Sequence, residues 1–229
     1  MEARERLGGR DGPWWPLASL VGHLTFGWPL YILRGASGGP KYGATSHFWP
    51  WGHSGALLLG GKELFPSASW KRRVLVSDAG VLAVLVGLGA WAAKAGVFKA
   101  ALLYLAPLAV TNAWLVLYTW LQHTDVDVAH FDELEHSWVK GAFQTVDRPY
   151  GPLLNLLHHG IGSTHVLHHV CSAVPHYHAW RATEAIKRAF PDRYLFDPTP
   201  VHRALGRVAR NCVAVEKLPG AEGAYIYTP

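Results

Sequence analysis

Two long apolar stretches stand out in the pattern of hydrophobic and polar positions along the chain. Residues 100–121 contain no Asp, Glu, Lys or Arg, and residues 74–93 contain only Asp78. Each stretch has the length of about 20 residues that an α-helix needs to cross the hydrocarbon core of a bilayer. Because the connection between them, residues 94–99, is short, the pattern predicts a transmembrane helical hairpin over residues 71–121.

Residues 14–33 form a third apolar segment of a different kind. It is long enough to cross a membrane, but Pro16, Gly27 and Pro29 are expected to interrupt a helix there. Its aromatic residues are of the types that prefer the membrane interface: Trp14, Trp15, Trp28 and Tyr31. We therefore interpret the region 14–70 as an interfacial or embedded segment followed by a loop. It comes after a polar leader, residues 1–13, that lacks the features of a removable signal peptide.

The charges that flank the predicted hairpin indicate its orientation. Three basic residues at 71–73 precede it, whereas only Lys94 and Lys99 lie near its turn. By the positive-inside tendency, both outer ends of the hairpin face the cytosol, and residues 122–229 are then cytosolic. This last region is predicted to be helical in places, at Trp180–Phe190 and over an amphipathic stretch at Thr199–Asn211.

Composition agrees with a membrane protein. Half of the residues are hydrophobic, only 16% are charged, and the formal net charge is +5. Because the basic residues flank apolar stretches instead of forming one run, anionic lipid headgroups are the expected partners and nucleic acid is not. Cys171 and Cys212 lie far apart in the region expected to face the reducing cytosol, so we predict two free thiols.

The most specific motif is the histidine run His165-Val166-Leu167-His168-His169. Histidines at positions i, i+3 and i+4 share one face of a helix and can aim their imidazoles at one point. We expect a short helix over residues 164–174, with an N-cap supplied by the Gly-, Ser- and Thr-rich approach and a stop at Pro175. This arrangement is typical of a metal site.

Neighbouring histidines strengthen the case for a metal. Imidazole ligands suit iron, zinc or copper, so the ligand type alone does not choose between them. Zinc hydrolases on a comparable helix place a Glu between the paired histidines, whereas this chain has His168, which favours oxygen activation by a redox metal.

Three carboxylates could orient ligand imidazoles or lie solvated in loops: Asp125, Asp127 and Asp132. The surrounding histidines are His123, His130, His136, His158 and His159.

Longer motifs carry a resemblance to a known family. They are FGWPLYI at 26–32, YTWLQHTD at 118–125, TVDRPYG at 145–151, HGIGSTHVLHH at 159–169 and FDPTPV at 196–201. In order and spacing the chain resembles membrane fatty-acid desaturases of the oleate, or delta-12, type, with a fungal-like character. The resemblance runs from about residue 20 to about residue 216 and corresponds to the carboxy-terminal half of such an enzyme.

The resemblance implies a mainly α fold, in which an integral membrane helical hairpin and a cytosolic helical histidine-box region form half of a four-helix transmembrane bundle. It implies two iron ions, for which this chain supplies the ligands His123, His165, His168 and His169. Two earlier histidine boxes of the family are not found in this sequence. The role of His159, just before the box, stays open.

The resemblance also implies a function and a setting. The family's reaction is the oxygen-dependent desaturation of an oleoyl phospholipid to linoleate, with electrons from cytochrome b5, in the endoplasmic reticulum membrane. The protein is expected to be multi-pass with cytosolic histidine boxes, and a homo-oligomer is allowed. Without the first two boxes, we expect this chain to be inactive on its own. The alternatives are a non-catalytic membrane protein derived from a desaturase and, among enzymes, a fatty-acid hydroxylase or acetylenase.

Overall fold

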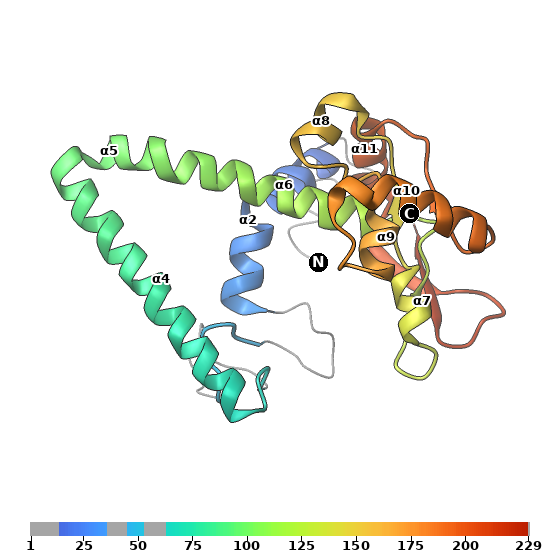
Figure 1. Cartoon of the computed structure of the whole chain (residues 1–229), viewed down its shortest axis with the longest axis horizontal. Helices are drawn as coiled ribbons and strands as arrows, with labels where there is room; N and C mark the ends of the chain where they lie inside the picture. Colours follow the sequence, from blue (N-terminus) through green and yellow to red (C-terminus); the bar gives the residue numbers. More distant parts are fainter. Residues whose placement is uncertain (1–13, 36–44, 53–62, 229) are drawn as a thin grey trace. The chain divides into compact units, whose positions relative to one another are not determined.

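The computed structural model describes residues 14–35, 45–52 and 63–228 of the 229-residue chain (Figure 1). The fold is mainly helical, with two small sheets, so the predicted fold class is confirmed. The chain divides into two compact units, here called the hairpin unit, Val21–Val116, and the histidine-rich unit, Met1–Leu20 with Leu117–Pro229. The boundaries predicted at 14, 71 and 122 stay predictions.

The hairpin unit is built around two long helices joined at Gly96. The first is α4, Ala68–Ala95, and the second runs without interruption from Val97 to His123. Both are long and apolar enough to cross a membrane. The second helix comprises three parts: α5 (Val97–Ala100), the π-helical η2 (Ala101–Leu105) and α6 (Ala106–His123). The last part, α6, continues into the histidine-rich unit.

Both helices are longer than predicted, and the connection is shorter. α4 starts at Ala68 because the Ser67 hydroxyl accepts a hydrogen bond from the backbone N–H of Trp70 at 3.3 Å, which is a normal N-cap. α4 ends at Gly96, whose φ of 94° is a backbone conformation that favours glycine. The predicted six-residue connection at 94–99 is therefore a single residue.

The two helices contact each other next to Gly96, where α4 packs against α5, and then diverge (Figure 1). Their apolar side chains are largely exposed; Val76 is 74% exposed and Phe98 is 82% exposed. Since apolar side chains at this density are unfavourable in water, these faces are suited to lipid or to neighbouring transmembrane helices.

The aromatic segment forms the continuous helix α2, Trp15–Arg34. The prediction that its prolines and Gly27 interrupt a helix was therefore wrong. Pro16 lies in the first turn, where a missing N–H costs nothing, and Pro29 removes one internal hydrogen bond from a helix that continues past it. The interfacial position of this segment stays a prediction.

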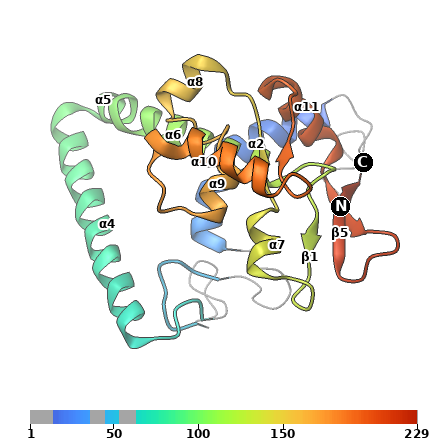
Figure 2. The same ribbon diagram turned by 45° about the vertical axis from the view of Figure 1, so that its right-hand side comes forward.

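The histidine-rich unit contains short helices and two small sheets, with β1 and β5 at one edge of it (Figure 2). Strands β1, β5 and β4 form an antiparallel sheet in that order, and β2 pairs in parallel with β3. The helix α9 contacts α10, α7 and β2. The helices are α7 (Trp138–Ala142), α8 (Gly151–Leu157), α9 (His165–Val170), α10 (His176–Ala189) and α11 (Val201–Asn211). The strands are β1 (His130–Phe131), β2 (Val146–Asp147), β3 (Leu195–Phe196), β4 (Ala214–Lys217) and β5 (Ala224–Thr228).

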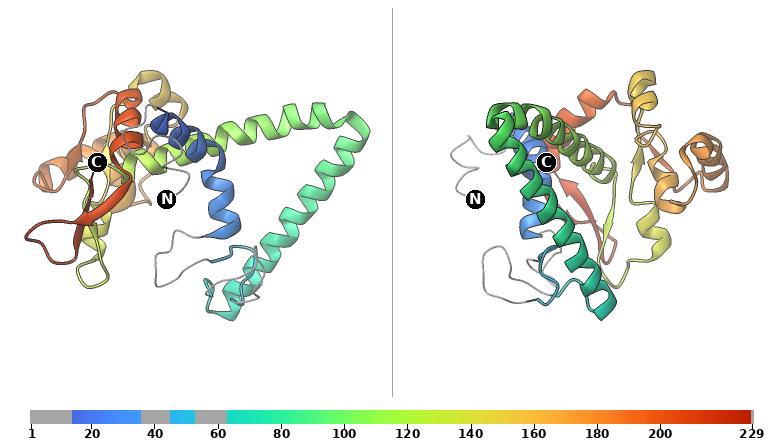
Figure 3. Two further views of the ribbon diagram at one scale, coloured as in Figure 1. Left: turned by 180° about the vertical axis from the view of Figure 1, so that it is seen from behind. Right: turned by 60° about the vertical axis from the view of Figure 1, so that its left-hand side comes forward.

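Two clusters of buried side chains hold these helices together. In the first, α11 packs on the last turns of α6 (Figure 3), with Leu121 and Tyr150 against Ala204 and Val208. In the second, α10 packs on α9 through Val166, Leu167, Ala179 and Ile186. Each helix buries one apolar face, as expected for an amphipathic helix of a small core.

The predicted helices of this unit exist, with shifted ends. The helix predicted at Trp180–Phe190 begins earlier, at His176, because Pro175 acts as its N-cap and not as the stop of the preceding helix. The helix around the histidine box is shorter than the predicted 164–174, since it ends at Val170. The amphipathic stretch at Thr199–Asn211 is helical from Val201, after Pro200.

Gly162 provides a test of the packing in front of α9. A Cβ at this position would overlap the ring of Tyr150 and lie 2.7 Å from the ring of Tyr118. We expect Gly162→Ala to destabilise the protein by about 1–3 kcal/mol, the usual cost of overpacking. Thermal unfolding of the detergent-solubilised chain measures this effect.

The control is Gly206→Ala in α11, where a Cβ meets nothing within 4 Å. This change should stabilise the helix by about 0.5–1 kcal/mol, because alanine is the better helix former. Equal unfolding temperatures for the two variants would contradict the packing described here.

Candidate metal centre

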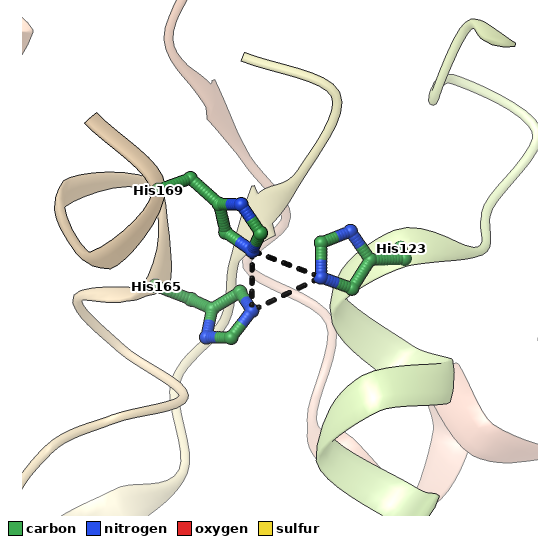
Figure 4. Close-up of side chains that lie close together, drawn as sticks. All are labelled: His123, His165 and His169. Carbon is green, nitrogen blue, oxygen red and sulfur yellow. Dashed lines mark hydrogen bonds between the residues drawn. The ribbon is translucent and has the colours of Figure 1, made fainter. Parts of the chain in front are cut away.

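Three histidine side chains converge in the histidine-rich unit (Figure 4). The Nε2 atom of His123 lies 3.2 Å from Nε2 of His165 and 3.0 Å from Nε2 of His169. The last two Nε2 atoms are 3.2 Å apart. His123 is the last residue of α6, and the other two lie one turn apart on α9. We call these three residues the histidine triad.

The spacing within the histidine triad fits a single metal ion. Nitrogen ligands at about 2.1 Å from one ion lie about 3.0 Å apart in octahedral and about 3.4 Å apart in tetrahedral geometry. The observed separations of 3.0–3.2 Å match this range. Neutral imidazoles suit iron, zinc and copper alike, so the geometry supports a metal without choosing one.

The orientation of His123 is fixed by the backbone. Its Nδ1 lies 3.3 Å from the carbonyl oxygen of Gln144, to which a protonated Nδ1 donates. That tautomer leaves the lone pair of Nε2 directed at the other two histidines. A carbonyl acceptor behind the far ring nitrogen is the usual support of a metal-binding histidine.

Helix α9 is held in place by Asp147 from strand β2. The buried Asp147 carboxylate accepts hydrogen bonds from the backbone N–H of Val166 at 2.9 Å and from the hydroxyl of Tyr194 at 2.6 Å. Thr164 is the N-cap residue, within the stretch predicted to supply it, but its hydroxyl donates to the carbonyl of Gly160 and does not cap the helix. A carboxylate at the first turn also suits the positive end of the helix.

The end of α6 is held by Arg148, the residue after Asp147. The fully buried Arg148 side chain donates from Nε to the carbonyl oxygen of Leu121 at 3.0 Å and forms ion pairs with Asp125 and Asp197. Arg207 of α11 pairs with the same two carboxylates at 2.5 and 2.6 Å. The neighbours Asp147 and Arg148 thus fix the two helices that carry the histidine triad.

The protonation state of the box histidines suits metal binding. Burial, followed by the proximity of the imidazoles of His123 and His169, lowers the pKa of His165 to about 3. Burial and the nearby imidazoles of His123 and His168 lower the pKa of His169 to about 4. Both rings are therefore neutral at pH 7, which is the form that binds a metal.

His168 does not join the histidine triad. Its side chain is exposed and lines a cavity of about 280 Å³ together with His158, His159 and His176. The reason is helix geometry: at 100° per residue, positions i+3 and i+4 lie on opposite sides of position i. His123 approaches from the side of His169, so His168 faces away from the histidine triad, toward the cavity of about 280 Å³.

The remaining predicted histidines have separate surroundings. His130 and His136 line a second cavity, of about 430 Å³, that also borders His123 and His169. The ring of His159, whose φ is 55°, lies 4.3 Å from the ring of His176. Among the three loop carboxylates, Asp125 pairs with arginines, Asp127 is exposed, and Asp132 accepts from the backbone of the following turn.

Comparison with known proteins places this chain in a family. The family model for fatty acid desaturases matches residues 6–199. The chain belongs to the fatty acid desaturase family. It is 41% identical over 211 residues to the Delta(12)-fatty-acid desaturase FAD2 of Vernicia fordii and 41% identical over 213 residues to the Delta(12)-fatty-acid desaturase of Arabidopsis thaliana. It is 44% identical over 198 residues to a protein of Brassica juncea named "Omega-6 fatty acid desaturase, endoplasmic reticulum".

These matches cover most of this desaturase chain and about half of each relative. They include 92%, 93% and 86% of the chain but 52%, 52% and 48% of the three relatives. The chain therefore spans about half the length of the curated relatives it matches. No solved structure matches it. The relatives named here are plant proteins, and the fungal-like character stays a prediction.

Two residues that the sequence interpretation overlooked hold the helices of the candidate site in place. Asp147 and Arg148 both lie in the motif TVDRPYG, which was recognised only as a family resemblance. The two adjacent charges between Val146 and Pro149 are the available signal, because such charges are buried only when they are paired. Their partners come from distant parts of the chain and are not visible in the motif.

Asp147 can be tested by removing its carboxylate. In Asp147→Ala, the buried Val166 N–H and the Tyr194 hydroxyl both lose their acceptor, at about 1–3 kcal/mol each, so we expect a destabilisation of about 2–6 kcal/mol. We also expect weaker metal binding, because α9 is no longer held. Urea unfolding and metal content of the purified protein measure the two effects.

Asp192→Ala is the matched control, because this carboxylate is exposed on the same unit. It should leave both quantities unchanged. Asp147→Asn keeps one acceptor oxygen and should recover part of the stability. If Asp147→Ala behaved like Asp192→Ala, the buried cap would be refuted.

Proposed function

We propose that this chain supplies part of the metal centre of a membrane-bound acyl-lipid desaturase. The observation that carries the proposal is the convergence of three neutral imidazoles within 3.0–3.2 Å at the end of a helix long enough to cross a membrane. A metal held there would lie at a depth that the acyl chain of a membrane lipid can reach. Family membership agrees with that chemistry.

In this proposal the histidine box serves two iron ions. His123, His165 and His169 hold one iron, and His168, which faces a different cavity, is a ligand of the second. Bound iron would supply the oxygen-dependent removal of hydrogen that no side chain of this chain can perform. The protein's own residues fix the ligands: Gln144 orients His123, Asp147 holds α9, and Arg148 holds the end of α6.

The relatives and the two long apolar helices support a proposal for the substrate and the setting. We infer an oleoyl phospholipid as substrate, converted to linoleate, because the relatives are named as delta-12 or omega-6 desaturases. We infer a multi-pass protein of the endoplasmic reticulum membrane, with the histidine box facing the cytosol. Cytochrome b5 would supply the electrons. The proposal is compatible with a homo-oligomer. A hydroxylase or acetylenase on the same scaffold would share all of these features.

A non-catalytic role is the second candidate. Among the described residues, the histidine triad is the one group of three potential ligands that converges. Three ligands can hold one ion but cannot complete two sites, so this chain by itself is expected to be inactive. Further ligands would have to come from another polypeptide segment.

The metal-binding part of the proposal predicts about one tightly bound iron per chain after anaerobic loading with Fe(II). His165→Ala and His169→Ala should lower the iron affinity at least about tenfold, since even the loss of a supporting residue costs about 10–100-fold. His168→Ala should retain the ion of the histidine triad. Elemental analysis of the detergent-purified protein across iron concentrations gives the affinity.

His178→Ala is the control, because His178 is exposed on α10. Its iron binding should equal that of the unaltered protein. Equal iron affinity in all four variants, or a loss in His168→Ala as large as in His165→Ala, would show that the histidine triad is not the site.

The catalytic part is tested in a yeast that makes no linoleate. The 229-residue chain alone should give no linoleate, because its converging ligands fill one site only. Coexpression with an amino-terminal half of the Arabidopsis relative should restore production, and His168→Ala should abolish it. Gas chromatography of the fatty acids measures the outcome. Linoleate from the chain alone, lost in His168→Ala, would overturn the expectation that the chain is inactive by itself.

A further inference from the structure

The chain contains a long segment without formal charge inside its histidine-rich unit. From Pro149 to Trp180 there is no Asp, Glu, Lys or Arg, although charged residues, Arg148 and Arg181, lie at both borders. The segment is not a transmembrane helix, since it folds into α8, a loop, α9 and the start of α10. An uncharged segment of this length is unusual for a surface that faces water.

Helix α8 is the part of this segment that is attached to the end of the long apolar helix. Just before α8, the ring of Tyr150 stacks on the ring of Tyr118 with the centroids 4.7 Å apart. Just after α8, Nδ1 of His158 lies 2.7 Å from the hydroxyl of the same Tyr118. Leu154, in the middle of α8, packs against the cluster that contains Leu121. Both ends and one face of α8 are therefore fixed to the last turns of α6.

This attachment determines where α8 lies along the apolar helix. Tyr118 comes five residues before His123, which corresponds to about 7.5 Å along the helix axis. At that level α6 is still made of apolar and aromatic residues. If the helix crosses the membrane, α8 lies at the boundary between the headgroups and the acyl chains.

The outer face of α8 consists of exposed leucines. Leu153, Leu156 and Leu157 are 65%, 74% and 60% exposed, respectively. Within the described residues nothing covers them. By contrast Leu134, which is 93% exposed, is flanked by Glu133 and Glu135, and such acidic neighbours are suited to water. The leucines of α8 have no charged neighbour in the sequence.

We propose that α8 is an interfacial membrane helix, which inserts Leu153, Leu156 and Leu157 among the lipid acyl chains of the leaflet next to the histidine triad. Three observations support lipid as the occupant: the fixed position of α8 on the end of a candidate span, the exposed leucine face, and the uncharged segment around it. Helix α8 then helps to set the depth of α9, because only the loop at 158–164 separates them.

Lipid-borne quenchers test this placement. The two native cysteines are first removed by Cys171→Ser and Cys212→Ala, and one new cysteine is labelled with a fluorophore in the full chain in phosphatidylcholine vesicles. The tested positions are Leu156→Cys and, independently, Leu153→Cys. Leu85→Cys in α4 is the positive control and Leu134→Cys the negative control, so every site replaces an exposed leucine.

We expect lipids brominated near the headgroup end of the acyl chain to quench the two α8 labels about twofold or more, because interfacial helices bury their apolar face roughly 5–10 Å into this boundary. The Leu134 label should be quenched by aqueous iodide instead. Quenching of both α8 labels by iodide would place the helix in water and overturn the proposal. Protection from both quenchers would mean that protein covers the leucines, which also overturns it.

The outcome is separate from that of the proposed function. The fluorescence measurement needs neither iron nor desaturation, and the Leu85 label reports independently whether α4 is in the bilayer. An inactive or metal-free protein can therefore confirm the placement of α8, and an active one can refute it.

Discussion

The buried guanidinium of Arg148 is the constraint on which the arrangement of the histidine-rich unit depends. Moving an isolated charge out of water costs several kcal/mol, so a fully buried arginine is tolerated only with its partners in place. Those partners come from three separate segments: the carbonyl of Leu121 at the end of α6, Asp125 just beyond it, and Asp197 after β3. Arg207 of α11 pairs with the same two carboxylates, so that two positive charges balance two negative ones. Folding must therefore bring these segments together in one geometry.

Strand β2 and the residue that follows it, Arg148, fix both halves of the candidate metal site. Asp147 points toward α9, and Arg148 points toward α6, as neighbouring residues of a β-strand end do when their side chains alternate. Helix α9 has only six residues, too few to be stable alone in water, so its position has to come from tertiary contacts. A shift in this strand would change the separation between His123 and His165 directly. The precision of the histidine triad thus depends on two adjacent residues that hold its helices and do not contact its imidazole rings.

The sequence predicts those features that depend on local pattern. The two apolar helices follow from composition and length, and the histidine box follows from its spacing. What the sequence could not predict depends on partners far along the chain. The cap of α9 comes from Asp147, 19 residues before Val166, and a good local N-cap candidate, Thr164, bonds elsewhere. The sequence could not show whether the Asp125 carboxylate is solvated or orients an imidazole. Its actual partners, Arg148 and Arg207, lie 23 and 82 positions away in the sequence.

The divided orientation of the box histidines has a simple origin in the helix. Viewed down the helix axis from His165, His169 is rotated by about 40° to one side and His168 by about 60° to the other. A third ligand that approaches from one side can therefore share a metal ion with only one of these two histidines. His123 approaches beside His169, at 3.0 Å between the Nε2 atoms. With this spacing, the three box histidines and His123 are poorly placed to bind one ion together. The spacing instead suits a helix that lies between two ions and supplies ligands to each. Because α9 is also separated from α8 by one short loop, the proposed insertion of α8 into lipid would set the depth of any ions that the box holds. The position of the substrate's acyl chain relative to the metal would then depend on how deeply three leucines of α8 insert into the lipid. This depth would therefore help to select the carbon atoms that react.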